Sequence, residues 1–212
     1  MKEISTYISE KLKLSGTKVL YHPKTKEELQ DIAFDLLSKD KNANLNVIDT
    51  SEITDMSYLF TGSRFKYKLR NINITGWDTS KVTNFEWMFA GCDEFDADVS
   101  NFDFKNSNGS FEKMFAGCLR FKGNGVDEWD IQPINAAAMF LSCRQFNMDV
   151  SNWDMSKCKN IKAMFERCLK FTNGGNMKGL DKWDISDSTE TRNVFLNADK
   201  FTYKPTWFDE DR

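Results

Sequence analysis

The chain contains little proline and histidine, and it lacks any long apolar run. It has 3 prolines and 1 histidine among 212 residues. No stretch approaches the roughly 18 apolar residues of a membrane span. The first residues, MKEISTYISEKLKL, mix charged with apolar side chains and lack the apolar core of a signal peptide. No Gly/Ser-rich or Pro-rich linker separates two parts. These absences predict one continuous domain in the cytoplasm, without membrane contact.

The usual signals of catalysis and of metal binding are also missing. The lone His22 precedes Pro23 and has no Ser or Cys to pair with, so we interpret it as an exposed turn residue. No phosphate-binding glycine loop, HExxH or CxxC occurs. The net charge of −3 gives no general attraction for nucleic acid. The sequence therefore predicts a protein that is not an enzyme, has no catalytic residues, cofactor or metal, and is unlikely to bind nucleic acid.

What the sequence does have is an internal repeat. The five residues MFAGC occupy positions 88–92 and again 114–118. When the chain is aligned on the phenylalanine of this motif, six units appear at intervals of 25 to 30 residues. A period of this length is typical of units that bury their apolar faces by stacking on one another. We call these residues the anchor phenylalanines: Phe60, Phe89, Phe115, Phe140, Phe165 and Phe195.

Other residue types repeat in step with the anchors. A second phenylalanine follows each anchor after five or six residues: Phe65, Phe95, Phe121, Phe146, Phe171 and Phe201. A cysteine follows four anchors after three residues: Cys92, Cys118, Cys143 and Cys168. An aromatic residue and an aspartate precede five anchors by about twelve: Trp77-Asp78, Phe102-Asp103, Trp129-Asp130, Trp153-Asp154 and Trp183-Asp184. We expect packing columns in which the cysteines are buried free thiols and the aspartates cap helices.

The spacing within one unit predicts a helix followed by a strand. Val82, Phe85, Met88 and Phe89 are spaced as one face of a helix that Gly91 ends. The segments DVSNFD (98–103) and DVSNWD (149–154) alternate as short strands do. The predicted fold class is therefore an α/β repeat solenoid, a stack of short helix/strand units.

The pattern D-V-S-N-W-D-x-S-x-x-x-N-x-x-x-M-F-x-x-C-x-x-F, clearest at residues 149–171, resembles the BspA-type leucine-rich repeats of bacterial surface proteins and mycoplasma lipoproteins. The resemblance covers about residues 48–209. It implies a leucine-rich-repeat-like solenoid used for adhesion or protein binding, with no catalytic residues. We assign the solenoid to residues 48–212 and an N-terminal α/β cap to residues 1–47. A helix with a capping box at Thr25 and Glu28 is expected in this cap.

Basic residues recur beside the second phenylalanine of several units. In a stack they would form one edge, which we call the basic strip: Arg64, Lys66, Lys68, Arg70, Arg120, Lys122, Lys170 and Lys200. The strip is either a solvated edge or a docking site for another protein with an acidic surface. The longer connections at 66–74 and 172–181 are further candidates for contact, because insertions in repeats gather on one face.

These observations predict a non-catalytic, protein-binding repeat scaffold. A phage or mobile-element protein that binds a host factor, or a minor virion component, is a hypothesis within that class. The alternative is a bacterial surface protein for adhesion or glycan binding. Phe208-Asp209 falls where a seventh unit would begin, so WFDEDR (207–212) either closes the core or rests on a partner. Self-association through the C-terminal end of the solenoid is therefore a further expectation.

Overall fold

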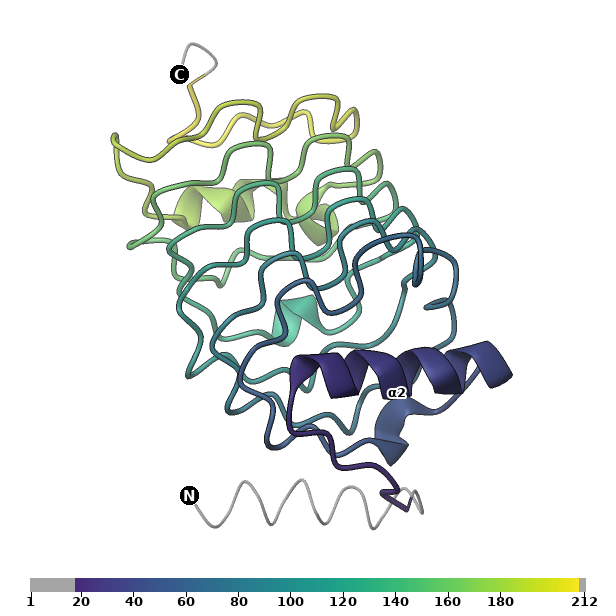
Figure 1. The fold of residues 1–212 in the computed structure, drawn as a ribbon. Helices are drawn as coiled ribbons and strands as arrows, with labels where there is room; N and C mark the ends of the chain where they lie inside the picture. The colour runs from purple at the N-terminus through teal and green to yellow at the C-terminus, as the bar shows by residue number, and fades with distance from the viewer. Residues whose placement is uncertain (1–17, 210–212) are drawn as a thin grey trace.

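The computed structural model describes residues 18–209, so the segment MKEISTYISEKLKL and residues 210–212 lie outside the described part. The described chain winds into coils that lie on one another (Figure 1). It contains one α-helix, α2 (Lys26–Lys39), and four 3-10 helices: η1 (Leu45–Val47), η2 (Val126–Glu128), η3 (Asn173–Gly175) and η4 (Met177–Lys182). We number the coils 1 to 6 after their anchor phenylalanines, from Phe60 to Phe195.

Helix α2 begins where the sequence predicts. The Thr25 hydroxyl accepts a hydrogen bond from the N–H of Glu28 at 3.2 Å. The Glu28 carboxylate accepts one from the N–H of Lys24 at 2.6 Å. The first bond satisfies an N–H group that the first turn of a helix leaves without a partner, and the second holds the residue before the N-cap. The Thr25 half of the predicted capping box is thus confirmed, whereas the Glu28 carboxylate binds the residue before the N-cap instead of Thr25. The helix buries Leu29, Ala33 and Leu37.

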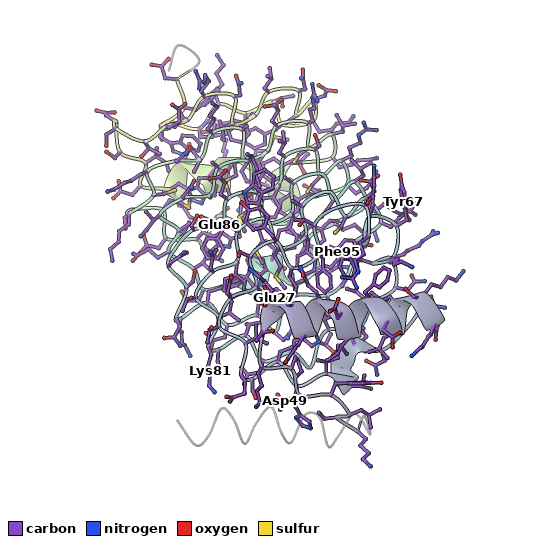
Figure 2. The ribbon with its side chains drawn as sticks, in the orientation of Figure 1. Glu27, Asp49, Tyr67, Lys81, Glu86 and Phe95 are labelled. Atoms are coloured by element: carbon purple, nitrogen blue, oxygen red, sulfur yellow. The ribbon has the colours of Figure 1, made fainter. Side chains whose placement is uncertain are left out.

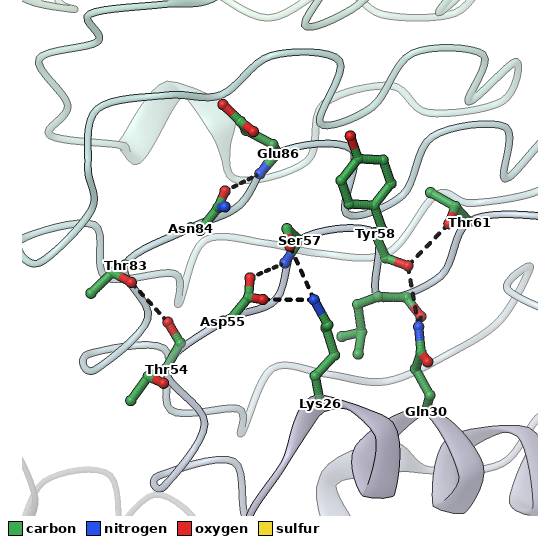
Figure 3. A network of polar contacts seen from close by, with 11 residues as sticks. Lys26, Gln30, Thr54, Asp55, Ser57, Tyr58, Thr61, Thr83, Asn84 and Glu86 are labelled. Atoms are coloured by element: carbon green, nitrogen blue, oxygen red, sulfur yellow. Dashed lines mark hydrogen bonds and ion pairs between the residues drawn. The ribbon is translucent and has the colours of Figure 1, made fainter.

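Helix α2 lies over the first coil, at the end of the stack opposite the last coil (Figure 1). The Gln30 side-chain amide donates to the carbonyls of Tyr58 and Leu59 at 3.2 and 2.8 Å. The Lys26 ammonium donates to the carboxylate of Asp55 at 2.6 Å, as Figure 3 shows. The helix therefore covers the N-terminal end of the stack and supplies donors to backbone acceptors there.

The predicted α/β repeat solenoid of short helix/strand units is wrong. Within residues 18–209 the repeats contain neither an α-helix nor a strand, and coils meet through isolated parallel bridges such as those of Asn135 with Ser110 and Asn160. The segments 98–103 and 149–154 are turns and irregular chain. Residue 21 in the expected cap likewise forms a single bridge, to Ile48.

The reason is a backbone reversal in every coil. The residue two before each anchor has a positive φ, between 52° and 62°. A right-handed helix cannot pass through such a residue, because its N–H then points away from the preceding turn. These residues are Tyr58, Trp87, Lys113, Ala138, Ala163 and Asn193.

Instead, successive N–H groups alternate between two partners. In coil 3 the N–H groups of Lys113 and Phe115 donate to carbonyls of coil 4, both at 3.0 Å. The N–H groups of Met114 and Ala116 donate three residues back, to Phe111 and Lys113. Half of the donors thus close turns and the other half join coil to coil. The backbone therefore follows a zigzag of short turns. This zigzag spaces the apolar side chains as one face of a helix would.

The packing columns are confirmed. Neighbouring anchor rings stack with centroids 5.4 to 5.9 Å apart through all six coils. The second phenylalanines form a parallel column from Phe95 to Phe201, at 5.3 to 6.2 Å. Figure 2 shows Phe95 inside the stack, with Tyr67 and Lys81 at its periphery. Offset aromatic stacking adds to the burial of apolar area, so the rings hold the coils in register.

One assignment at the C-terminus needs correction. Trp207, not Phe208, continues the tryptophan column, because its ring stacks on Trp183 at 5.8 Å. Its indole N–H donates to the carbonyl of Leu180 at 2.7 Å, as that of Trp183 does to Val150 at 3.0 Å. Phe208 instead meets Phe195 edge to face at 5.4 Å. The regular spacing of the repeat predicts the wrong residue by one position, because the connection from Phe201 to Trp207 is one residue shorter than in regular units.

Candidate binding surfaces

The first part of the basic strip packs against helix α2. The Arg64 guanidinium lies 4.0 Å from the centre of the Phe34 ring and forms an ion pair with Asp31 at 2.8 Å. The Lys68 ammonium lies 5.2 Å from the centre of the same ring. Cations over aromatic faces are attracted by the ring quadrupole. Two predicted docking residues therefore join the helix to the stack.

The middle of the basic strip is matched by acidic residues of the neighbouring coil. Arg70 and Arg120 both approach the carboxylate of Glu94, each at 3.6 Å. Two more pairs lie beside them: Lys66 with Asp93 at 3.5 Å, and Lys122 with Asp96. Exposed pairs of this kind contribute about 0–1 kcal/mol each, so they mask charge more than they stabilise. In this part of the basic strip, acidic and basic side chains therefore lie side by side.

Lys170 and Lys200 lie exposed at the far end of the basic strip, and neither forms an ion pair within residues 18–209. Stacking thus brings these charges into one row, in which Lys68 also has no ion pair within residues 18–209 and lies over the Phe34 ring. The role of the basic strip as a docking site stays a prediction.

The two long connections differ in how they are held. In 172–181, the buried Asn173 amide donates to the Ser151 hydroxyl at 2.8 Å and its carbonyl accepts from the N–H of Val150 at 2.9 Å. That connection is anchored in the stack through η3 and η4. In 66–74, Leu69 is fully buried while Tyr67 is 68% exposed. Tyr67, its basic neighbours and the exposed Asn71 and Asn73 offer a contact surface there.

The cysteine column is a ladder of buried thiols, as predicted. The Cys118 thiol donates to the carbonyl of Phe89 at 3.1 Å, and the Cys143 thiol to that of Phe115 at 3.0 Å. Cys92 and Cys168 repeat this contact with the anchor of the preceding coil. Burial raises the pKa of the Cys118 thiol well above its ordinary value. The column therefore fills the core and donates hydrogen bonds to backbone carbonyls.

The aspartate column caps turns rather than helices. Asp49, Asp78 and Asp154 each accept the N–H two residues on, at 2.9 to 3.0 Å. For Asp154, the hydrogen bonds from Ser156 hold the pKa of the carboxyl below its usual value. Within the described residues, no three His, Cys, Asp or Glu side chains gather as a cation site would require. His22 is exposed and lies 3.2 Å from Asp49.

A groove crosses the first coils on the face where the chain reverses. It encloses about 570 Å³, and its floor is made of backbone and small residues: Gly62, Ala90, Gly91, Ala116 and Gly117. Each of these glycines lies two residues after an anchor and has a positive φ. A methyl group added at Gly62 or Gly91 would meet nothing within 4 Å, so the space above them is open. We call this feature the glycine-floored groove.

One wall of the glycine-floored groove is an aromatic and cationic ladder. The rings of Tyr58 and Trp87 stack at 5.6 Å, and the Lys113 ammonium lies 4.1 Å from the centre of the Trp87 ring. Tyr58 comes from the coil before Trp87 and Lys113 from the coil after, so both faces of the indole are covered. The ring edges and the Lys113 stem form the wall.

The groove ends where the glycines end. In the last three coils Ser142, Arg167 and Asn197 replace glycine at the same position and keep its positive φ. Leu141 and Ser142 line the far end of the groove. Lys113 is the one charged residue among the lining residues, and it also lies 3.4 Å from Glu112. The groove therefore offers apolar edges, exposed backbone and one cation.

Comparison with known protein families identifies the family of the chain. Two overlapping segments, residues 30–138 and 109–208, match a family described as Mycoplasma protein of unknown function, DUF285. The chain belongs to this family. The two segments together span nearly the whole stack, which agrees with the mycoplasma-type repeat seen in the sequence. No curated protein and no solved structure matches the chain.

Sequence reasoning missed the glycine-floored groove of this DUF285 protein. The signal is present in the sequence, because three successive units carry glycine two residues after the anchor, and the two copies of MFAGC supply two of these glycines. A glycine after an apolar run predicts the end of a helix, and that interpretation does not reveal the open side of the coil. Within residues 18–209, no helix is long and apolar enough to cross a bilayer.

Proposed function

We propose that this protein is a non-catalytic scaffold that binds another protein, and that the glycine-floored groove receives a segment of that partner. The observation that carries the proposal is an open, apolar hollow of about 570 Å³ whose floor is backbone across coils 1 to 3. Peptide-binding grooves combine apolar walls with a few polar groups that fix orientation. A groove whose floor carries only glycine and alanine lets an extended chain approach closely.

The chemistry of the wall favours a partner segment with apolar and acidic side chains. The Lys113 ammonium supplies one cation inside the groove. Lys170 and Lys200 on the basic strip add exposed cations on later coils. A partner with an acidic surface would gain attraction from these groups, chiefly in its association rate.

Glycan binding is less well supported by this geometry. Sugars usually pack on an open aromatic face and bond to carboxylates or amides. Both faces of Trp87 are covered, by Tyr58 and by Lys113. The lining also carries the hydroxyls of Tyr58, Thr61 and Ser142, but among these lining residues there is no carboxylate or side-chain amide. The relation of the repeat to the BspA type, a cytoplasmic location and a phage or mobile-element origin stay predictions.

The experiment compares affinity purifications from host lysate by quantitative mass spectrometry. Ala116→Leu fills the groove floor, and Tyr58→Ser removes part of the wall, while Tyr67→Ser is the matched control on an exposed tyrosine outside the groove. We expect a partner whose recovery is kept by wild type and Tyr67→Ser and falls at least about tenfold with Ala116→Leu. Each variant is first checked for an unchanged melting temperature.

Two results would redirect the proposal. Equal recovery by wild type and Ala116→Leu contradicts binding in the groove. Loss of the partner only in the double variant Lys170→Glu/Lys200→Glu would assign binding to the basic strip instead, because these lysines form no ion pair within the described residues.

A further inference from the structure

The last coil leaves a row of backbone donors without acceptors. In coil 5 the N–H groups of Ile161, Ala163, Phe165 and Arg167 donate to carbonyls of coil 6 at 2.8 to 2.9 Å. The equivalent donors of coil 6 belong to Thr191, Asn193, Phe195 and Asn197, and within residues 18–209 none of these N–H groups has an acceptor. We call them the terminal donor row. A row of unpaired backbone N–H groups of this kind is a template for pairing with another chain.

A hollow of about 420 Å³ lies beside the terminal donor row. Phe195 and Leu196 of coil 6 line one side, and Tyr203 and Phe208 of the following segment line the other. The Phe195 ring stacks with Phe201 at 4.3 Å and with Phe165 at 5.9 Å, and it meets Phe208 edge to face at 5.4 Å. The hollow is therefore lined both by residues of the terminal donor row and by apolar side chains.

A second polar group points to a ligand at this place. Thr191 lines the hollow and is only 1% exposed, yet its hydroxyl has no hydrogen-bond partner within the described chain. A buried hydroxyl without a partner costs about 1–3 kcal/mol, so native structures rarely leave one. An acceptor or donor brought by a bound segment would satisfy it.

A second copy of this protein does not complement the terminal donor row. The coil carbonyls that would match it lie at the opposite end of the stack, where Gln30 of α2 already donates to the carbonyl of Leu59 at 2.8 Å. Head-to-tail stacking would first have to displace α2. Two C-terminal ends placed against each other bring donors to donors. Neither arrangement of two copies therefore brings carbonyls to the terminal donor row.

We propose that the C-terminal end of the stack binds an extended segment of a partner protein, which adds its backbone to coil 6 as a seventh coil would. The partner gives carbonyls to the terminal donor row and lays an apolar side chain on the Phe195 ring. Addition of a strand-like segment to an exposed edge is a known mode of peptide recognition, in which the backbone gives affinity and alternate side chains give specificity. This site is separate from the glycine-floored groove.

The test uses a synthetic peptide of residues 187–201, DSTETRNVFLNADKF, titrated into the full ¹⁵N-labelled protein. In the intact chain, carbonyls of this segment, such as that of Val194, accept from coil 5. The same backbone is therefore expected to pair with coil 6. We expect saturable shifts of the amide signals of Thr191, Asn193, Phe195 and Asn197.

Two substitutions in the protein and one in the peptide locate the contact. Leu196→Asp places a charge in the hollow and is expected to weaken peptide binding at least tenfold, while Leu169→Asp, on a comparably exposed leucine outside the hollow, is expected to leave it unchanged. In a further peptide, aspartate replaces the phenylalanine that matches Phe195. This peptide is expected to bind at least tenfold more weakly, and the protein itself is unchanged.

Three outcomes overturn the proposal. The first is no saturable shift of the four amides at millimolar peptide. The second is a set of shifts gathered around Tyr58 and Trp87, which would assign the peptide to the glycine-floored groove and leave the proposed function standing. The third is concentration-dependent self-association that broadens the four amides without peptide, because the occupant would then be a second copy.

Discussion

The sign of one small stability difference tests the backbone reversal in the repeats. Asn193 lies two residues before its anchor, has a φ of 62°, and is exposed with its side chain clear of any hydrogen bond within the described residues. We compare Asn193→Ala with Asn193→Gly. The pair differs by a single methyl group at an exposed position, so packing changes little and the backbone conformation decides the outcome.

The two backbone conformations give opposite signs. A residue with a Cβ is disfavoured in the left-handed region by about 1–2 kcal/mol, and glycine is disfavoured by about 0.5–1 kcal/mol through its freedom in the unfolded chain. The glycine variant should therefore be more stable than the alanine variant by about 0.5–1 kcal/mol at a reversed residue. In a helix, alanine would instead be more stable than glycine by about 1 kcal/mol.

The assay is urea unfolding of both variants followed by tryptophan fluorescence, with the free energy of unfolding compared at equal slopes. Wild type is expected close to the glycine variant, because asparagine tolerates the left-handed region better than alanine. Thermal unfolding should agree, with a shift of about 2–4 °C per kcal/mol for a chain of this size. A more stable alanine variant would refute the reversal and restore the helix in this unit.

Two further outcomes follow from burial and from charge. The thiols of Cys118 and Cys168 should not react with a thiol reagent at pH 8 in the native protein, because burial raises the pKa of both; all five cysteines should react in denaturant, and rapid native labelling would contradict the ladder. Burial alone would raise the pKa of Asp55, but hydrogen bonds from Lys26 and Ser57 outweigh it and lower the pKa. A lowered pKa adds stability above the unfolded value of about 3.9 that is lost as pH falls through the folded value. The stability gap between wild type and Asp55→Asn should therefore be present at pH 6 and shrink below about pH 4, and a constant gap in urea midpoints would contradict this account.

The sequence alone determined which residues stack. Identical residues recur at one period only where each occupies the same buried place, so the anchor phenylalanines, the cysteines and most of the tryptophans could be assigned to the core without coordinates. Helix α2 was also readable, because its capping box and its apolar face both depend on local spacing. In each case a side-chain pattern reports burial directly.

The tertiary structure decided the path of the backbone and everything that depends on it. The spacing of Val82, Phe85, Met88 and Phe89 fits a helix and a zigzag of turns equally well, because both place these side chains on one face. Hydrogen bonds to the neighbouring coil, such as that from Phe89 to Met114 at 2.8 Å, select the zigzag. The glycine-floored groove and the terminal donor row exist only once coils lie side by side. Local spacing carries no record of where an N–H group finds its acceptor, so only the stacked coils could reveal these surfaces.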